Sequence, residues 1–320
     1  MAKPDAIEVF KAYNRIKRYI VNTPTIYSEN YSEYVDGHVY LKLENMQITG
    51  SFKLRGVLNK IIKNRLSNTT VVSASAGNHG KALAYAANLF NLEAHIFIPS
   101  NAPKNKREAI KRFGAKLIEV AGDYDEAEKA AREYAEEKGL TYLSPYNDID
   151  IIYGQGTVGL EIAREAPEID IIIVPVGGGG LISGISILLK SIDPDIEIIG
   201  VQSSASPSIY ESIKSGKIVE VELKESIADG LHGNIERDSI TFEIIRDMVD
   251  EIILVDEDDI EKAIINLIKT HQIIVEGAAA TSLATLMKYI DRFRDRNICI
   301  ILTGRNIDYE LLNKLMSKYS

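Results

Sequence analysis

The sequence contains no tryptophan and only one cysteine, Cys299, and these shortages already limit what the chain can be. A lone cysteine allows no intramolecular disulfide, so we expect a reducing compartment, the cytoplasm, rather than a disulfide-stabilised secreted fold. Cys299 lies inside the apolar run 297–302. This setting predicts a buried strand thiol that packs as a small hydrophobic side chain.

The chain also has no apolar run close to the roughly 20 residues that a membrane span needs. It begins with MAKPDAIEVFKAYNRIKRY, a charged and helix-like stretch without the apolar segment of a signal peptide. We therefore expect no membrane partner.

Basic residues are not in excess, because 37 Lys and Arg stand against 46 Asp and Glu, giving a net charge of −9. This balance argues against a general nucleic-acid surface. It does not exclude a small anionic ligand, because backbone dipoles act locally. The most basic stretch, 104–116, has Glu108 as its one acid. We interpret it as a solvated helix face, with a phosphate-bearing partner as the alternative.

From about residue 69 onward, short β-branched runs alternate with longer amphipathic stretches. This alternation predicts an α/β fold of two open, doubly wound parallel-sheet domains. The expected strands are 69–73, 94–98, 116–120, 170–174, 196–201, 251–255 and 297–302, and the expected helices are 78–90, 104–113, 123–138, 157–165, 181–191, 258–270 and 276–289. No repeat, low-complexity tract or Gly/Ser linker marks a boundary. We predict a small domain over residues 50–145 and a large domain over 1–49 and 146–320.

Two loops lie between an expected strand and an expected helix, where unpaired N–H groups of helix N-termini favour anions. The run Gly177, Gly178, Gly179 and Gly180 before Leu181 suits a phosphate, and a plain flexible turn is the alternative. The second loop contains Ser75, Gly77, Asn78 and His79. It is a candidate carboxylate cradle, although a simple helix N-cap would explain it equally well.

Two further loops carry candidate chemistry. Ser51 is expected to cap a helix and to place Lys53 in its first turn, where the positive helix end lowers the pKa of the amine. An amine of lowered pKa suits Schiff-base chemistry, whereas an isolated lysine is more often a solvated surface residue. Thr303, after the last expected strand, offers a hydroxyl at a tight turn.

The segment 154–159 matches the GxGxxG pattern of dinucleotide-binding sites. Residues 149–153 form only a weak strand before it, and no acid ends the next strand. We therefore expect Gly156 and Gly159 to allow close helix packing, and a nicotinamide-dependent oxidoreductase stays a remote alternative.

Taken together, these loops resemble one family across nearly the whole chain. They are similar to the fold-type II pyridoxal-phosphate enzymes, which have the fold of the tryptophan synthase β-subunit, on the threonine dehydratase and serine racemase branch. The matching segments are ENMQITGSFKLRG (44–56), SASAGNHG (73–80), GQGTVGLEI (154–162), VPVGGGGL (174–181), ADG (228–230), EGAAA (276–280) and TGRNID (303–308).

The resemblance implies pyridoxal 5′-phosphate as cofactor, held mainly by the large domain, and assigns roles to matching residues. Lys53 would form the Schiff base with the cofactor and later remove the α-proton of the substrate. The other cofactor contacts would be Phe52 at the ring, Asn78 at the ring hydroxyl, Thr303 at the ring nitrogen, Glu276, and the loop of Gly177, Gly178, Gly179, Gly180 and Leu181 at the phosphate. Ser75, Gly77, Asn78 and His79 would border the substrate carboxylate.

The implied reaction is a dehydratase reaction, in which L-threonine gives 2-oxobutanoate and L-serine gives pyruvate, each with ammonia. Ala76 stands where serine racemases carry a second serine, which disfavours racemisation. Gln202 and Ser208 replace the acids of a metal site that some members use, so no metal is expected. A serine racemase and a 3-hydroxyaspartate dehydratase remain the alternatives.

The resemblance also bears on the substrate side-chain pocket, the turn at Thr303, the C-terminal end and the oligomeric state. The substrate side chain would meet residues 276–280 and the loop 229–233, where His232 is either a surface residue or a substrate contact. The turn at Thr303 reads Thr-Gly-Arg-Asn where the family usually has Ser-Gly-Gly-Asn, so Arg305 is a departure. The chain ends soon after this turn, so we expect no C-terminal regulatory domain. A homodimer or higher homo-oligomer is expected from the family alone.

Overall fold

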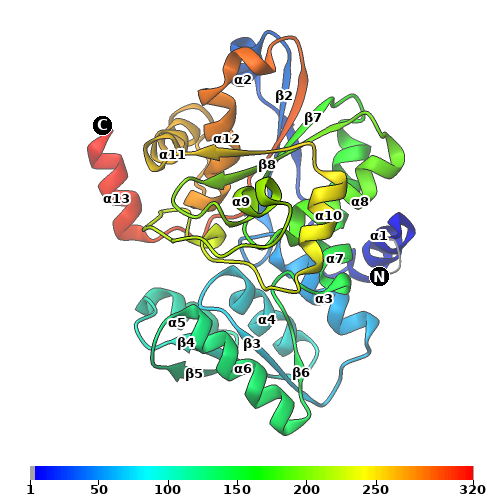
Figure 1. Ribbon diagram of the computed structural model, residues 1–320, viewed down its shortest axis with the longest axis vertical. Helices are drawn as coiled ribbons and strands as arrows, with labels where there is room; N and C mark the ends of the chain where they lie inside the picture. Colours follow the sequence, from blue (N-terminus) through cyan, green and yellow to red (C-terminus); the bar gives the residue numbers. More distant parts are fainter. Residues whose placement is uncertain (1–3, 320) are drawn as a thin grey trace.

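A sheet whose strands carry apolar side chains on both faces must be covered by helices on both faces. The computed structural model, which describes residues 4–319, arranges the strands in a six-stranded sheet of order β1-β2-β10-β7-β8-β9 and a four-stranded sheet of order β5-β4-β3-β6. In Figure 1 the four-stranded sheet lies with α4, α5 and α6 in the lower part, and the six-stranded sheet fills the upper part.

The strands are β1 (Thr25–Tyr27), β2 (His38–Lys42), β3 (Thr70–Ala74), β4 (Glu93–Pro99), β5 (Lys116–Val120), β6 (Thr141–Tyr142), β7 (Ile171–Pro175), β8 (Glu197–Ser203), β9 (Glu251–Val255) and β10 (Asn297–Ile301). The α-helices are α1 (Ala6–Ile16), α2 (Glu29–Val35), α3 (Lys53–Lys63), α4 (Asn78–Leu89), α5 (Lys104–Lys111), α6 (Tyr124–Lys138), α7 (Ile149–Glu165), α8 (Gly180–Ile192), α9 (Ser208–Ser215), α10 (Ile240–Met248), α11 (Glu257–His271), α12 (Gly277–Lys288) and α13 (Tyr309–Lys318). Short 3-10 turns are η1 (Glu44–Met46), η2 (Asp229–Leu231) and η3 (Ile290–Phe293).

The six-stranded sheet separates two hydrophobic cores because successive side chains of each strand point to opposite faces. On one face, Ile171 and Ile173 of β7 pack with residues of α11 and α12. On the other face, Ile172 and Val174 pack with residues of α7, α8 and α10. Cys299 is fully buried in this second core, as predicted, and burial raises the pKa of its thiol to about 12.

The parallel arrangement is confirmed, with one correction. Strand β1 pairs antiparallel with β2 at the sheet edge, whereas the other strand pairs are parallel. Among the helices of residues 4–319, none combines the length and hydropathy of a membrane span. All strands of the smaller sheet fall within residues 70–142, while the predicted domain limits at 50 and 145 stay a prediction.

The segment 149–153, which is weak as a strand in the sequence, forms the first turns of α7, so this helix begins before the predicted limit at residue 157. The Asp148 carboxylate caps this helix by accepting hydrogen bonds from the backbone N–H groups of Asp150 and Ile151. The GxGxxG segment therefore lies inside a buried helix rather than in a phosphate-binding turn. A Cβ atom on Gly154 would lie 2.6 Å from the Cα of Gly56. Gly154 and Gly156 allow α7 to approach α3 and α8, as expected for Gly156. The same expectation for Gly159 is wrong, because the helix packing leaves room for a Cβ there.

A substitution on α7 tests this packing role. Gly156→Ala would place a Cβ 2.5 Å from the carbonyl oxygen of Gly184 on α8, so we expect the free energy of unfolding to fall by about 1–3 kcal/mol. Gly159→Ala is the matched control, because its Cβ would lie 3.5 Å from the nearest atom, the Cα of Ile185. The control should be neutral or stabilising, since Ala favours helix over Gly. Urea unfolding of both variants measures the difference, and equal stabilities would contradict the packing role.

A buried ionic network anchors α3. The Arg55 guanidinium donates to both carboxylate oxygens of Glu44 and to both of Glu161 over 2.7–2.8 Å. Lys42 adds an ion pair to Glu161 at 2.9 Å, and these four side chains are all fully buried. The network fixes the helix that begins at Lys53 against η1 and α7.

Candidate active site

Backbone hydrogen bonds bring Lys53 and Thr303 to the same place. The Phe52 N–H donates to the Thr303 carbonyl at 3.2 Å, and the Arg305 N–H donates to the Gly50 carbonyl at 2.9 Å. Ser51 forms a β-bridge with Gly304, and its buried hydroxyl has no partner within residues 4–319. The expectation that Ser51 caps the helix is therefore wrong, because its backbone is committed to that bridge. Helix α3 begins at Lys53 after Phe52, without a side-chain cap.

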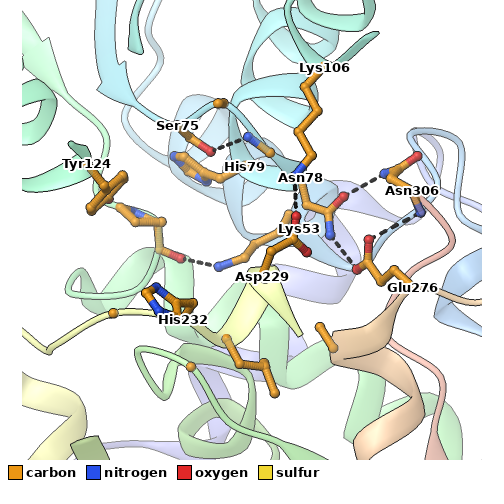
Figure 2. Close-up of a pocket in the computed structure, with 18 of the residues that line it drawn as sticks. Lys53, Ser75, Asn78, His79, Lys106, Tyr124, Asp229, His232, Glu276 and Asn306 are labelled. Carbon is orange, nitrogen blue, oxygen red and sulfur yellow. Dashed lines mark hydrogen bonds and ion pairs between the residues drawn. The ribbon is translucent and has the colours of Figure 1, made fainter. Parts of the chain in front are cut away.

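Lys53 faces a cavity of about 1100 Å³. The residues that line it come from the part of the molecule with the four-stranded sheet and from the part with the six-stranded sheet. Its Nζ donates to the Pro145 carbonyl at 3.0 Å and lies 5.2 Å from the centre of the Phe52 ring. Burial lowers the pKa of this amine to about 8, partly opposed by the carboxylate of Glu276. The direction agrees with the sequence expectation, and the main cause is desolvation rather than the helix end. Figure 2 shows Lys53 among the polar residues of the cavity.

The glycine loop forms another wall of the cavity and leads into α8. A Cβ on Gly178 would lie 2.3 Å from the Tyr146 ring, and one on Gly177 would lie 3.1 Å from the Cα of Leu231. Gly179 has a φ of +85°, a conformation that glycine adopts without strain. Side chains are thus excluded on the packed side of the loop, while the first N–H groups of α8 have no intrahelical partner. This arrangement suits an oxyanion such as phosphate.

A series of hydrogen-bonded polar side chains lies along the cavity, from Lys81 to Glu276. The Asn78 amide donates to Glu276 Oε1 at 2.6 Å and accepts from the Asn306 amide at 2.6 Å. Lys81 is the last member of this series, and its Nζ donates to Asn306 Oδ1 at 2.8 Å. The sequence predicts no role for Asn306, although it lies in the quoted TGRNID segment. Its partners cannot be read from the sequence, because they come from separate segments.

Glu276 is buried, and burial together with the nearby charge of Asp229 raises the pKa of its carboxyl to about 7. Gly304 makes room for it, because a Cβ there would lie 2.3 Å from Glu276 Oε1. The carboxyl also accepts from the Asn306 N–H at 3.2 Å. Near neutral pH this group therefore exists in both protonation states.

The raised pKa of Glu276 makes stability depend on pH. The folded protein binds the Glu276 proton more tightly than the unfolded chain does. The contribution of this proton to the free energy of unfolding is therefore complete below about pH 4.5 and is lost as pH rises through about 7. In cofactor-free protein, we expect the free energy of unfolding of wild type relative to Glu276→Gln to fall by about 2–3 kcal/mol between pH 4.5 and 8. Urea unfolding across this range measures it, and a constant difference would contradict the shifted pKa.

The remaining predicted residues also line the cavity: Ser75, Gly77, His79, Leu181, Thr303 and His232. Ser75 Oγ accepts from the Gly77 N–H at 3.2 Å, which shapes the loop before α4. His79 is buried, its Nε2 donates to the Leu143 carbonyl at 3.2 Å, and burial lowers its pKa to about 3. The ring is therefore neutral and supplies no positive charge to a substrate carboxylate. His232 is exposed, and its Nε2 lies 3.1 Å from the Lys224 carbonyl.

The donor set fits pyridoxal phosphate. The loop with free N–H groups suits its phosphate, the Lys53 amine suits its aldehyde, and the Asn78 amide and the Phe52 ring suit an aromatic ring with a hydroxyl group. Among residues 4–319, no cluster of three or more His, Cys, Asp or Glu side chains is arranged to hold a metal ion.

Comparisons with known proteins agree with this chemistry. A family model described as pyridoxal-phosphate dependent enzyme matches residues 16–304. The L-threonine ammonia-lyase of Thermotoga maritima is 38% identical over 97% of this chain and 78% of its own length. The catabolic L-threonine dehydratase of Staphylococcus aureus is 39% identical over 94% of this chain and 88% of its own.

Solved structures of relatives share the fold. Maize serine racemase superposes with a TM-score of 0.90 at 34% identity and covers 99% of this chain and 98% of its own. The processed form of threonine deaminase isoform 2 from Solanum lycopersicum superposes with a TM-score of 0.88 at 32% identity, covering 98% of this chain and 95% of its own.

Proposed function

Because the chain belongs to the family of pyridoxal-phosphate dependent enzymes, we propose that it is an ammonia-lyase that acts on L-threonine and L-serine. Threonine would lose its α-proton and its β-hydroxyl, and the resulting enamine would hydrolyse to 2-oxobutanoate and ammonia. Serine would give pyruvate in the same way. The observation that carries the proposal is the Lys53 amine, whose pKa is lowered to about 8 at a cavity walled by the glycine loop.

Bound pyridoxal phosphate supplies an electron sink next to the amino group of the substrate, and the protein supplies orientation and proton transfer. Lys53 would hold the cofactor, and as a partly unprotonated amine near neutral pH it can accept the α-proton. The N–H groups from Gly177 to Leu181 would hold the phosphate. Asn78, fixed by Glu276 and Asn306, would present its amide to the ring hydroxyl.

The substrate would be oriented by the loop from Ser75 to Asn78, whose groups face the cavity. Thr303 would face the ring nitrogen with a neutral hydroxyl. A neutral partner leaves that nitrogen largely unprotonated, which favours quick loss of the β-hydroxyl over reprotonation.

Racemisation of serine is the second candidate, since maize serine racemase is among the similar structures. Ala76 lines the cavity in the loop before α4 and carries no acid or base. A racemase needs a proton donor on each face of the substrate α-carbon, and Ala76 offers none, so elimination is favoured.

The proposed function is tested by incubating the cofactor-loaded protein with L-threonine and with L-serine. We expect release of 2-oxobutanoate and pyruvate with an equal amount of ammonia, and no D-isomer in the recovered amino acid. Accumulation of D-serine without 2-oxo acid would replace the ammonia-lyase by a racemase. No reaction with either amino acid would contradict the proposal.

A cytoplasmic location and assembly into a homodimer belong to the same proposal. The unpaired, buried thiol of Cys299 supports a reducing compartment, and the family resemblance supports the dimer. Light scattering of the cofactor-loaded protein should give twice the mass of one chain, whereas the mass of one chain would contradict the dimer.

A further inference from the structure

An ion pair joins the two sides of the cavity. Lys106 on α5 contacts Asp229 on η2, and both residues line the cavity that Lys53 faces (Figure 2). Helix α5 packs with the four-stranded sheet, whereas η2 packs with α12 beside the six-stranded sheet. The Lys106 side chain is 24% exposed and the Asp229 side chain is 51% exposed, so the lysine is the more buried member of the pair.

The turn that carries Asp229 lies next to the reacting groups. A Cβ on Gly177 of the glycine loop would lie 3.1 Å from the Cα of Leu231. A Cβ on Gly230 would lie 3.1 Å from the Cβ of Ala278 and 4.0 Å from Glu276 Oε1. The turn therefore spans the wall between the glycine loop and Glu276. Both members of the pair act on the pKa of Glu276, which Asp229 raises and Lys106 lowers.

The charges that line the cavity are unfavourable for a second anionic group on the substrate. The acids are Glu225, Asp229, Glu257 and Glu276. The lysines are Lys53, Lys81 and Lys106, and within the described part of the chain each is already engaged: Lys53 with Pro145, Lys81 with Asn306, and Lys106 with Asp229. A carboxylate on the substrate side chain would have to displace Asp229 from Lys106 while lying beside it.

We propose that the pair of Lys106 and Asp229 is a charge filter that restricts the substrate to hydroxyamino acids with an uncharged side chain. This inference rests on the proposed function and deepens it, because it separates threonine and serine from 3-hydroxyaspartate. Asp229 both repels an acidic side chain and occupies the lysine that could bind one. When Asp229 is neutral, the Lys106 ammonium loses this carboxylate and can form an ion pair with a second carboxylate instead.

The test compares kcat/KM for 3-hydroxyaspartate with kcat/KM for L-threonine in wild type, Asp229→Asn, Lys106→Met and the double variant. We expect the ratio to rise at least about tenfold in Asp229→Asn, as a hydrogen bond to a charged group contributes about that much. The rise should be absent in the double variant, because the gain requires Lys106. Glu261→Gln, a charge removal on α11 whose carboxylate pairs with Lys318, should leave the ratio unchanged.

A binding measurement that needs no turnover accompanies the kinetics. Succinate, a dicarboxylate, should raise the unfolding temperature of cofactor-loaded Asp229→Asn more than that of wild type or of the double variant. An unchanged ratio and an unchanged succinate effect in Asp229→Asn would overturn the filter. An equal gain in the double variant would also overturn it, since Lys106 would then play no part. If wild type acts on no hydroxyamino acid, the proposed function fails, and the succinate effect still tests the pair.

Discussion

Replacing Lys53 by alanine should reduce 2-oxo acid release from L-threonine by at least about a thousandfold, since the variant loses both the amine that holds the cofactor and the proton acceptor. In the structure this amine faces the cavity, and burial lowers its pKa to about 8. Alanine is compatible with the first turn of α3, so the fold should be kept. Release of 2-oxo acid and circular dichroism measure the two effects separately.

The control for Lys53→Ala is Lys63→Ala, which removes a lysine at the other end of the same helix. Lys63 forms an ion pair with Asp150 at 2.6 Å and has a side chain that is 33% exposed. We expect its activity to stay within a factor of about two, because Lys63 lies outside the cavity lining and Asp150 keeps its ion pair with Lys60. If Lys53→Ala retained substantial activity, or if both variants lost it equally, Lys53 would not be the reacting amine.

Replacing Arg55 by methionine should lower the free energy of unfolding by about 3–5 kcal/mol, because it removes the cation that binds the buried Glu44 and leaves the buried Glu161 with Lys42 alone. Arg55 binds Glu44 and Glu161 through paired hydrogen bonds, and all three side chains are fully buried. Against the cost of burial, the charge of Arg55 keeps the pKa of Glu44 below its ordinary value. Urea unfolding measures the change.

The matched control is Arg292→Met at the surface. Arg292 also contacts two carboxylates, those of Glu197 and Glu251, but its side chain is 34% exposed. We expect a loss of less than about 1 kcal/mol there. Glu44→Gln is a milder variant of the buried network, and it should fall between the two. Equal losses at Arg55 and Arg292 would mean that burial does not govern the strength of the network.

The local structure of single segments can be predicted from the sequence. The glycine run directly after an apolar strand predicts the anion-binding loop, and it does begin α8. The pattern around Lys53 predicts the first turn of a helix, and α3 begins there. Both predictions depend on residues that are neighbours in the chain, so the local pattern contains the necessary information.

The features that the sequence does not predict depend on distant segments. The amide of Asn306 meets Asn78 only because the turn after β10 and the first turn of α4 line the same cavity. The pair of Lys106 and Asp229 crosses the cavity, although the charge pattern around Lys106 predicts a solvated face. The predicted helix 157–165 misses the start of α7 at Ile149 because glycine weakens a helix pattern. Only the close approach of Gly56 and Gly184 explains why Gly154 and Gly156 are needed there.

The lysine that holds the cofactor can be identified by chemical mapping of the attachment site. The protein is loaded with pyridoxal phosphate, reduced with borohydride and digested, and the masses of the peptides are measured by mass spectrometry. We expect the mass of the reduced cofactor on the peptide that contains Lys53, and on no other lysine in stoichiometric amount. Attachment at another lysine, or none at all, would contradict this expectation.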